Sequence, residues 1–100
     1  MKVVYTDTAL AEIEQIISYI ERDNPISANA VAAAIARTVD RLAKRPKSAP
    51  VVHGTKVQAK LVERYQYRIF FEVEGDVLIV RNVRSTRRQR PWESGGAGQI

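Results

Sequence analysis

The sequence has no cysteine and a single histidine, His53, among its 100 residues. A disulfide framework and a thiol nucleophile are therefore excluded, and a zinc site or a Ser-His-Asp triad is hard to assemble. No apolar run approaches the ~20 residues of a membrane helix, and the N-terminus lacks the pattern of a signal peptide. We therefore expect a cytoplasmic protein that uses no metal or cofactor and does not enter a membrane.

Glycine and proline are also scarce, with five and four residues respectively, and no linker or internal repeat divides the chain. A chain of this length, with 45% hydrophobic residues, has room for only one core. We predict a single domain over residues 1–93. Residues 94–100 are rich in glycine and lack apolar anchors, which predicts a flexible C-terminal tail.

The first half of the chain predicts two amphipathic helices. The first follows N-cap oxygens at residues 6–8 and ends at residues 23–25, before a proline. The second starts at once, capped by Asn24 or by Ser27, and six alanines within residues 28–36 keep it narrow. The two helices can therefore pack closely as an antiparallel hairpin. Their predicted buried stripes are Leu10, Ile13, Ile16, Ile17 and Ile20, and then Ala28, Val31, Ala32, Ile35, Val39 and Leu42.

The second half of the chain predicts β-structure after a loop at residues 46–54. Residues 77–80 are continuously apolar, which indicates a central strand covered on both faces. Residues 74–76 have turn chemistry, so the last two strands should form a hairpin. The predicted strands cover residues 2–5, 56–62, 67–73 and 77–83.

The predicted order is therefore βααβββ, an α+β fold. An N-terminal strand and an antiparallel two-helix hairpin would pack on a three- to four-stranded, mainly antiparallel sheet. The opposite face of the sheet, or its rim, would be partly polar and would carry Arg68, Glu72, Arg81 and the arginine run from Arg84 to Arg90.

Positive charge is concentrated in the second half of the chain. Residues 1–43 contain four Lys/Arg and six Asp/Glu, whereas residues 44–93 contain twelve and five. Five arginines and no acid lie within residues 81–90. Such a cluster suits a polyanion, an acidic protein surface or plain solvent.

Several segments, in one order along the chain, carry a resemblance to a known family. They are Ala9-Leu10-Ala11-Glu12-Ile13 through Tyr19-Ile20, Asn24-Pro25, residues 39–46, 67–73 and 77–83, and Arg84-Ser85-Thr86-Arg87-Arg88. Together they resemble the ParE/RelE superfamily of small bacterial toxins from toxin–antitoxin pairs, and its ParE-like, plasmid-stabilisation branch in particular. The likeness covers about residues 3–93.

This resemblance implies a toxin held inactive by a cognate, ParD-like antitoxin, whose C-terminal segment wraps the toxin as helix and strand. ParE-like members are known as inhibitors of DNA gyrase, whereas RelE-like members cleave messenger RNA in the ribosome. Since both share one fold, the residues must decide between them. For the ribosome-dependent endoribonuclease, the basic positions of the family fall near Lys60, Arg68 and Arg87.

Acid–base chemistry distinguishes the two alternatives. Cutting RNA requires groups that activate the 2′-hydroxyl and protonate the leaving oxygen. All four tyrosines precede residue 68, and the C-terminal stretch offers Trp92, whose indole cannot shuttle a proton. The sequence therefore favours a non-catalytic gyrase inhibitor that acts by protein–protein contact, with the endoribonuclease as the alternative.

Arginine and tryptophan are frequent interface anchors, and residues 84–92 contain both. We therefore expect the target to bind near the C-terminus. The predicted target-binding residues are Arg81, Arg84, Arg87, Arg88, Arg90 and Trp92, with solvated arginines and a Trp92 packed on the sheet as the other interpretation. The predicted antitoxin-binding residues are Leu10, Ile17, Ile35, Leu42 and Arg68, and the four apolar ones would alternatively belong to the core. Without a helix-turn-helix, we expect nucleic acid to be bound only weakly or through the antitoxin complex.

Overall fold

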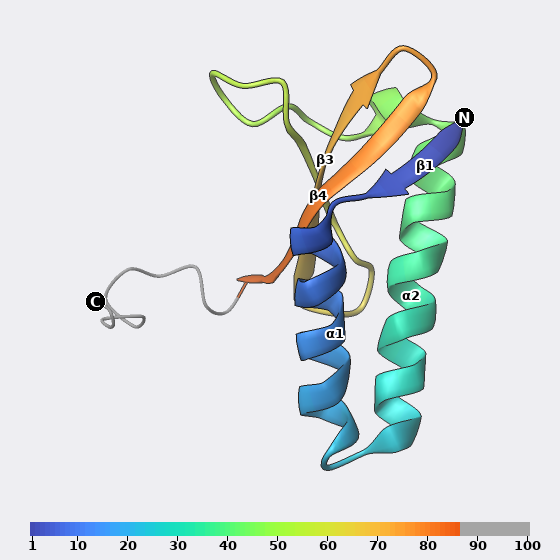
Figure 1. Ribbon diagram of the computed structural model, residues 1–100, viewed down its shortest axis with the longest axis vertical. Helices are drawn as coiled ribbons and strands as arrows, with labels where there is room; N and C mark the ends of the chain where they lie inside the picture. The colour runs from blue at the N-terminus through green and yellow to red at the C-terminus, as the bar shows by residue number, and fades with distance from the viewer. Residues whose placement is uncertain (87–100) are drawn as a thin grey trace.

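The computed structural model describes residues 1–86 and has the predicted element order (Figure 1). The elements are β1 (Lys2–Tyr5), α1 (Asp7–Glu21), α2 (Pro25–Lys44), the 3₁₀ turn η1 (Pro46–Ser48), β2 (Gln58–Leu61), β3 (Tyr67–Glu74) and β4 (Val77–Ser85). The α+β prediction is confirmed. The predicted strand at residues 56–62 is shorter than expected, and the predicted loop contains η1.

Both helices begin where local chemistry predicts. The Thr6 hydroxyl accepts a hydrogen bond from the Ala9 amide at 3.0 Å, which satisfies a donor that the first turn of α1 cannot pair. At α2, Asn24 caps the Ser27 amide at 3.0 Å and Pro25 occupies the first turn. The helices lie side by side, and in Figure 1 their connection extends well beyond the sheet.

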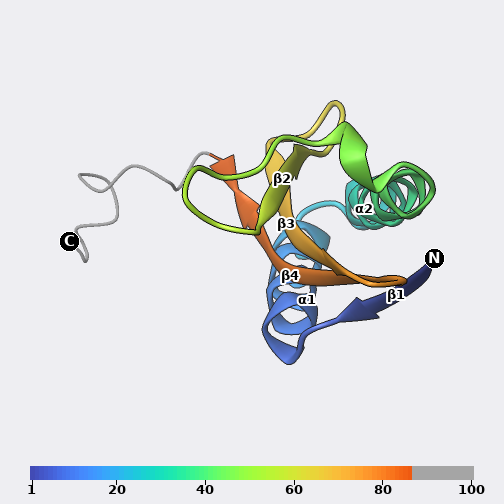
Figure 2. The same ribbon diagram turned by 90° about the horizontal axis from the view of Figure 1, so that it is seen from above.

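The sheet has the order β1-β4-β3-β2, with β1 parallel to β4 and the other pairs antiparallel. Figure 2 shows its twist and the two helices beside it. The central position of β4 is confirmed, but only one of its faces is fully buried. Leu78 and Val80 are inaccessible, whereas Ile79 is half-buried and Arg81 is exposed.

A β-bulge on β4 changes which of its residues point toward the core after Val80. Phe71 pairs with Val80 and Phe70 with Asn82, so Arg81 is an extra residue without a partner on β3. The insertion shifts the alternation, and Val83 turns toward the core together with Val80.

The core lies between the helical hairpin and one face of the sheet. Phe71 is the largest fully buried side chain, and it sits at the middle of β3. Small residues let the helices approach, since Ala9 and Ala28 are also inaccessible. The largest fully buried residues are Phe71, Leu42, Ile69, Leu78, Val39, Val62, Val80 and Val83. Within residues 1–86, neither helix is long and apolar enough to cross a membrane.

Tyr5, at the end of β1, packs against this core, and its environment predicts a loss of stability in alkali. Burial, with a smaller effect from the charge of Asp40, raises the pKa of the Tyr5 hydroxyl above its ordinary value of about 10. The folded state therefore holds this proton more tightly than the unfolded state does. The stabilisation is complete below pH ~10 and is lost as pH rises through the folded pKa. Urea unfolding at pH 9 to 11.5 should show a steeper decline for the natural protein than for Tyr5→Phe, and equal declines would contradict this assignment.

Candidate partner-binding site

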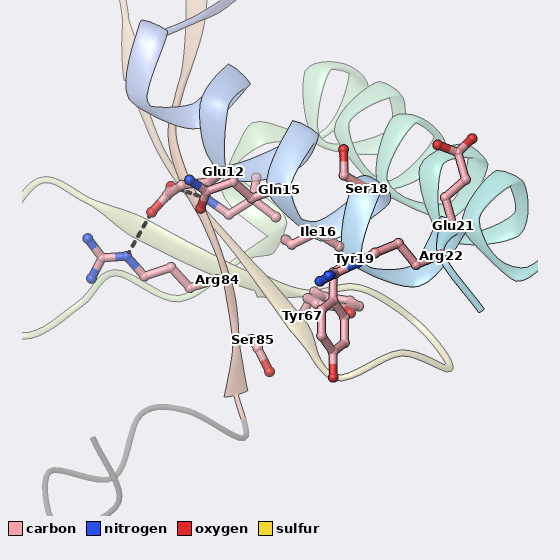
Figure 3. Close-up of a pocket in the computed structure, with 11 residues that line it drawn as sticks. Glu12, Gln15, Ile16, Ser18, Tyr19, Glu21, Arg22, Tyr67, Arg84 and Ser85 are labelled. Atoms are coloured by element: carbon pink, nitrogen blue, oxygen red, sulfur yellow. Dashed lines mark hydrogen bonds and ion pairs between the residues drawn. The ribbon is translucent and has the colours of Figure 1, made fainter. Parts of the chain in front are cut away.

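An open pocket lies between α1 and the C-terminal end of β4 (Figure 3). β1 pairs with β4 only as far as Tyr5 opposite Val80, so a helix takes the place of a strand beside the rest of β4. The pocket has a volume of about 1040 Å³. Its lining residues are Glu12, Gln15, Ile16, Ser18, Tyr19, Glu21, Arg22, Tyr67, Val83, Arg84 and Ser85.

Glu12 closes the edge of β4 at one side of this pocket. Its Oε1 accepts hydrogen bonds from the Val83 amide at 3.0 Å and from Asn82 Nδ2 at 3.2 Å. Its Oε2 accepts one from Arg84 Nε at 3.3 Å. The carboxylate thus satisfies a backbone donor that a neighbouring strand would otherwise pair, and it joins α1 to β4.

Removing this carboxylate should destabilise the fold. In Glu12→Ala the Val83 amide and the Asn82 side chain lose their acceptor, so the free energy of unfolding should fall by about 1–3 kcal/mol in urea titrations. Glu14→Ala is the matched control, because Glu14 lies exposed on the same helix. A Glu12→Ala protein as stable as the control would show that the three hydrogen bonds contribute nothing.

Aromatic side chains flank the far side of the pocket. Tyr19 is 57% exposed, and the Arg22 guanidinium carbon lies 5.4 Å from its ring centroid, a cation–π distance. Tyr67 and Ile16 are half-buried, and Val83 is buried beneath them. An apolar floor with an aromatic and charged rim is the composition of a protein-binding surface.

Two arginines face one another across the strands beside the pocket. Arg68 of β3 pairs directly with Arg84 of β4, and both are exposed. Like charges directly opposite one another on a sheet repel. Glu12 offsets one of them, while Arg68 has no ion pair within residues 1–86. The pair therefore favours contact with a carboxylate or another anion.

The predicted target-binding residues have different environments. Arg81 is held at 2.6 Å by Glu72, on the face of the sheet away from the core. Arg84 lines the pocket, with about half of its side chain exposed. Arg87, Arg88, Arg90 and Trp92 lie outside the described residues.

The predicted antitoxin-binding residues also differ in exposure, and some of them are buried. Ile35 and Leu42 are 3% and 1% exposed, so both belong to the core, where they pack against the sheet. This corrects their placement on an open groove. Leu10 is 52% exposed, Ile17 is half-buried and Arg68 is exposed.

Two of the residues considered for RNA cleavage, Lys60 and Arg68, point to different faces of the sheet. Lys60 pairs with Ile69, and Leu61 pairs with Arg68. Since successive residues of a strand point to opposite faces, Lys60 and Arg68 lie on opposite faces of the sheet. Arg87 lies outside the described residues. Within residues 1–86, no group of three or more His, Cys, Asp or Glu is placed to hold a metal ion.

Sequence reasoning missed the part of the site contributed by α1. The sequence pattern alone places Glu12 on a solvated helix face, and it gives Tyr19 and Tyr67 no role in binding. The sequence did contain one indication that α1 contributes to the site, because only one residue, Thr6, separates β1 from α1. The pairing of β1 with β4 therefore places the start of α1 beside the end of β4.

Known proteins resemble this chain in sequence and in fold. A family model described as "ParE toxin of type II toxin-antitoxin system, parDE" matches residues 3–90. No curated protein matches the sequence. Among solved structures, the fold is similar to one titled "Chromosomal ParDE TA system from P. aeruginosa", with a TM-score of 0.75, 18% identity, and coverage of 85% of this chain and 95% of that one. It is also similar to a "YoeB/ParE toxin from Agrobacterium tumefaciens", with a TM-score of 0.62, 16% identity, and coverage of 85% and 98%.

Proposed function

The chain belongs to the ParE toxin family of type II toxin–antitoxin systems, and from this premise we propose that it inhibits DNA gyrase by protein–protein contact and is neutralised by a cognate antitoxin. Both interactions need a complementary surface and no reaction chemistry. The pocket between α1 and β4, with Arg68 and Arg84 beside it, is our candidate for that surface.

The cross-strand pair of Arg68 and Arg84 is the observation that carries the proposal. Two exposed guanidinium groups side by side are unfavourable in the isolated chain and favourable once an acidic group binds them. An antitoxin segment could place apolar side chains against the half-buried Ile16 and Tyr67 while its acids contact the arginines. The antitoxin would then cover the same surface that contact with the target requires.

The placement of Lys60 and Arg68 supports binding over RNA cleavage. A phosphodiester undergoing cleavage needs its cationic and acid–base groups around one reacting atom. These two residues start from opposite faces of the sheet, so the register does not gather them around one phosphate. The endoribonuclease alternative therefore has less support than inhibition of gyrase.

Two reconstituted assays run in parallel test the proposal. Purified protein is added to gyrase-catalysed supercoiling of relaxed plasmid and to ribosomal translation of a defined messenger RNA. We expect lost supercoiling and intact RNA, with supercoiling restored by the antitoxin. Cleaved RNA with normal supercoiling would replace the proposal with the endoribonuclease, and an effect in neither assay would reject both activities.

A further inference from the structure

A second pocket lies on the other helix, away from the site described above. It has a volume of about 290 Å³. Its walls come from α2 and from the turn between β2 and β3. The lining residues are Ala34, Arg37, Thr38, Arg41, Glu63, Arg64 and Tyr65.

Three arginines give this small pocket its character. Arg37 and Arg41 are one helical turn apart on α2, so they lie on the same face, and Arg64 approaches from the turn. Within residues 1–86, none of the three guanidinium groups has an ion pair. Glu63 also lines the pocket, and in this described part of the chain no ion pair joins it to them. The lining therefore has a formal charge of +2, from three arginines and one glutamate.

The backbone at Arg64 is unusual. Residues 62–65 form a tight turn, closed by the Tyr65 amide donating to the Val62 carbonyl at 3.2 Å, and Arg64 has a φ of 72°. This left-handed conformation suits glycine and is strained for a long side chain. Such strain persists mainly where the side chain has a use. Here it holds a third guanidinium at the pocket.

The floor of the pocket contributes space and no competing donor. Ala34 and Thr38 are almost fully buried, and the Thr38 hydroxyl donates to the Ala34 carbonyl at 2.8 Å. The side-chain donors that remain in the lining are the three guanidinium groups and the Tyr65 hydroxyl. The planar guanidinium groups match the oxygens of phosphate.

We propose that this pocket binds a single phosphate monoester group. The +2 lining complements the dianion that a monoester forms at neutral pH, whereas a diester carries one charge. Glu63 opposes the approach of further phosphates, which disfavours a nucleic-acid backbone. A phosphorylated side chain and a mononucleotide share the required chemistry. The site is separate from the proposed toxin surface and does not depend on the proposed function.

Titrations followed by backbone amide NMR test the site, with inorganic phosphate, phenyl phosphate and dimethyl phosphate as probes. Shifts should centre on residues 37–41 and 63–65, and phenyl phosphate should bind at least about 10-fold more tightly than the diester. Adenosine 5′-monophosphate and a phosphoserine peptide then distinguish the two sources of the group. Equal binding of the diester, or tighter binding of an oligonucleotide without a terminal phosphate, would overturn the monoester assignment.

Two substitutions with opposite expected effects show whether Arg64 and Glu63 influence phosphate binding. Arg64→Gly should weaken phenyl phosphate binding about 10-fold while the Tm stays unchanged or rises by up to about 8 °C, because glycine relieves the turn. Glu63→Gln should strengthen binding several-fold by removing the repulsion. Lys56→Gln, which removes one positive charge from an exposed loop, is the control and should change little. If all three variants bind alike, or Arg64→Gly matches Lys56→Gln, the proposal fails.

Discussion

Replacing Phe71 by alanine should lower the free energy of unfolding by about 3–5 kcal/mol. Its ring is the largest fully buried side chain, and it lies between the sheet and the helices at the residue next to the β-bulge. The cavity cannot close easily, because Val80 and Gln58 are fixed on either side by strand pairing. The free energy of unfolding of a small domain is only about 5–15 kcal/mol in total. The Phe71→Ala variant should therefore be close to unfolding at 37 °C.

Phe70→Ala is the matched control for that measurement. The neighbouring phenylalanine is the same residue type on the same strand, but it points to the other face and is only half-buried. Replacing Phe70 by alanine should lower the free energy of unfolding clearly less than Phe71→Ala does. Guanidinium unfolding curves for both variants would decide the matter, and equal losses would mean that the buried face of β3 is assigned incorrectly.

Reversing the charge of the cross-strand pair should have the largest effect on binding. In Arg68→Glu/Arg84→Glu, two attractive contacts with an acidic segment become repulsive, so affinity for the antitoxin should fall about 100-fold or more at low salt. Calorimetric titration of the antitoxin into each protein measures this. The affinity of the natural protein should also fall as salt rises, and that of the variant should not.

A control variant separates this effect from net charge and from folding. Lys44→Glu/Lys47→Glu makes the same change in charge on residues at the end of α2 and in η1, and it should bind almost normally. Far-UV circular dichroism must show that the arginine variant is folded, because the carboxylate introduced at position 84 would face Glu12. An equal loss of affinity in both variants would reduce the role of the arginines to long-range attraction.

The parts of the fold set by short-range chemistry could be predicted from the sequence. The caps at Thr6 and Asn24, the proline at the start of α2 and the turn at Gly75 each depend on neighbouring residues. The central position of β4 could be predicted as well, from its apolar run. The extra residue at Arg81 could not, because a bulge depends on the register between two strands.

The candidate site was predictable only in part, for a similar reason. Arg84 belongs to a visible cluster of like charge. Its partner Glu12 lies 72 positions earlier, and nothing local distinguishes that glutamate from others on the helix surface. Ile35 and Leu42 were predicted to bind the antitoxin but belong to the core. The sequence cannot separate the two cases, because an apolar stripe has the same pattern whether it packs on a core or on a partner.

We propose that the protein acts on gyrase by reversible contact and not by chemistry. Titrating it into a supercoiling reaction of known gyrase concentration, and then adding antitoxin, tests this most directly. We predict that inhibition reaches completion near one protein per gyrase subunit and that antitoxin restores the full rate. Complete inhibition at far lower ratios, or inhibition that persists after excess antitoxin, would show that the protein does not act by reversible, stoichiometric contact.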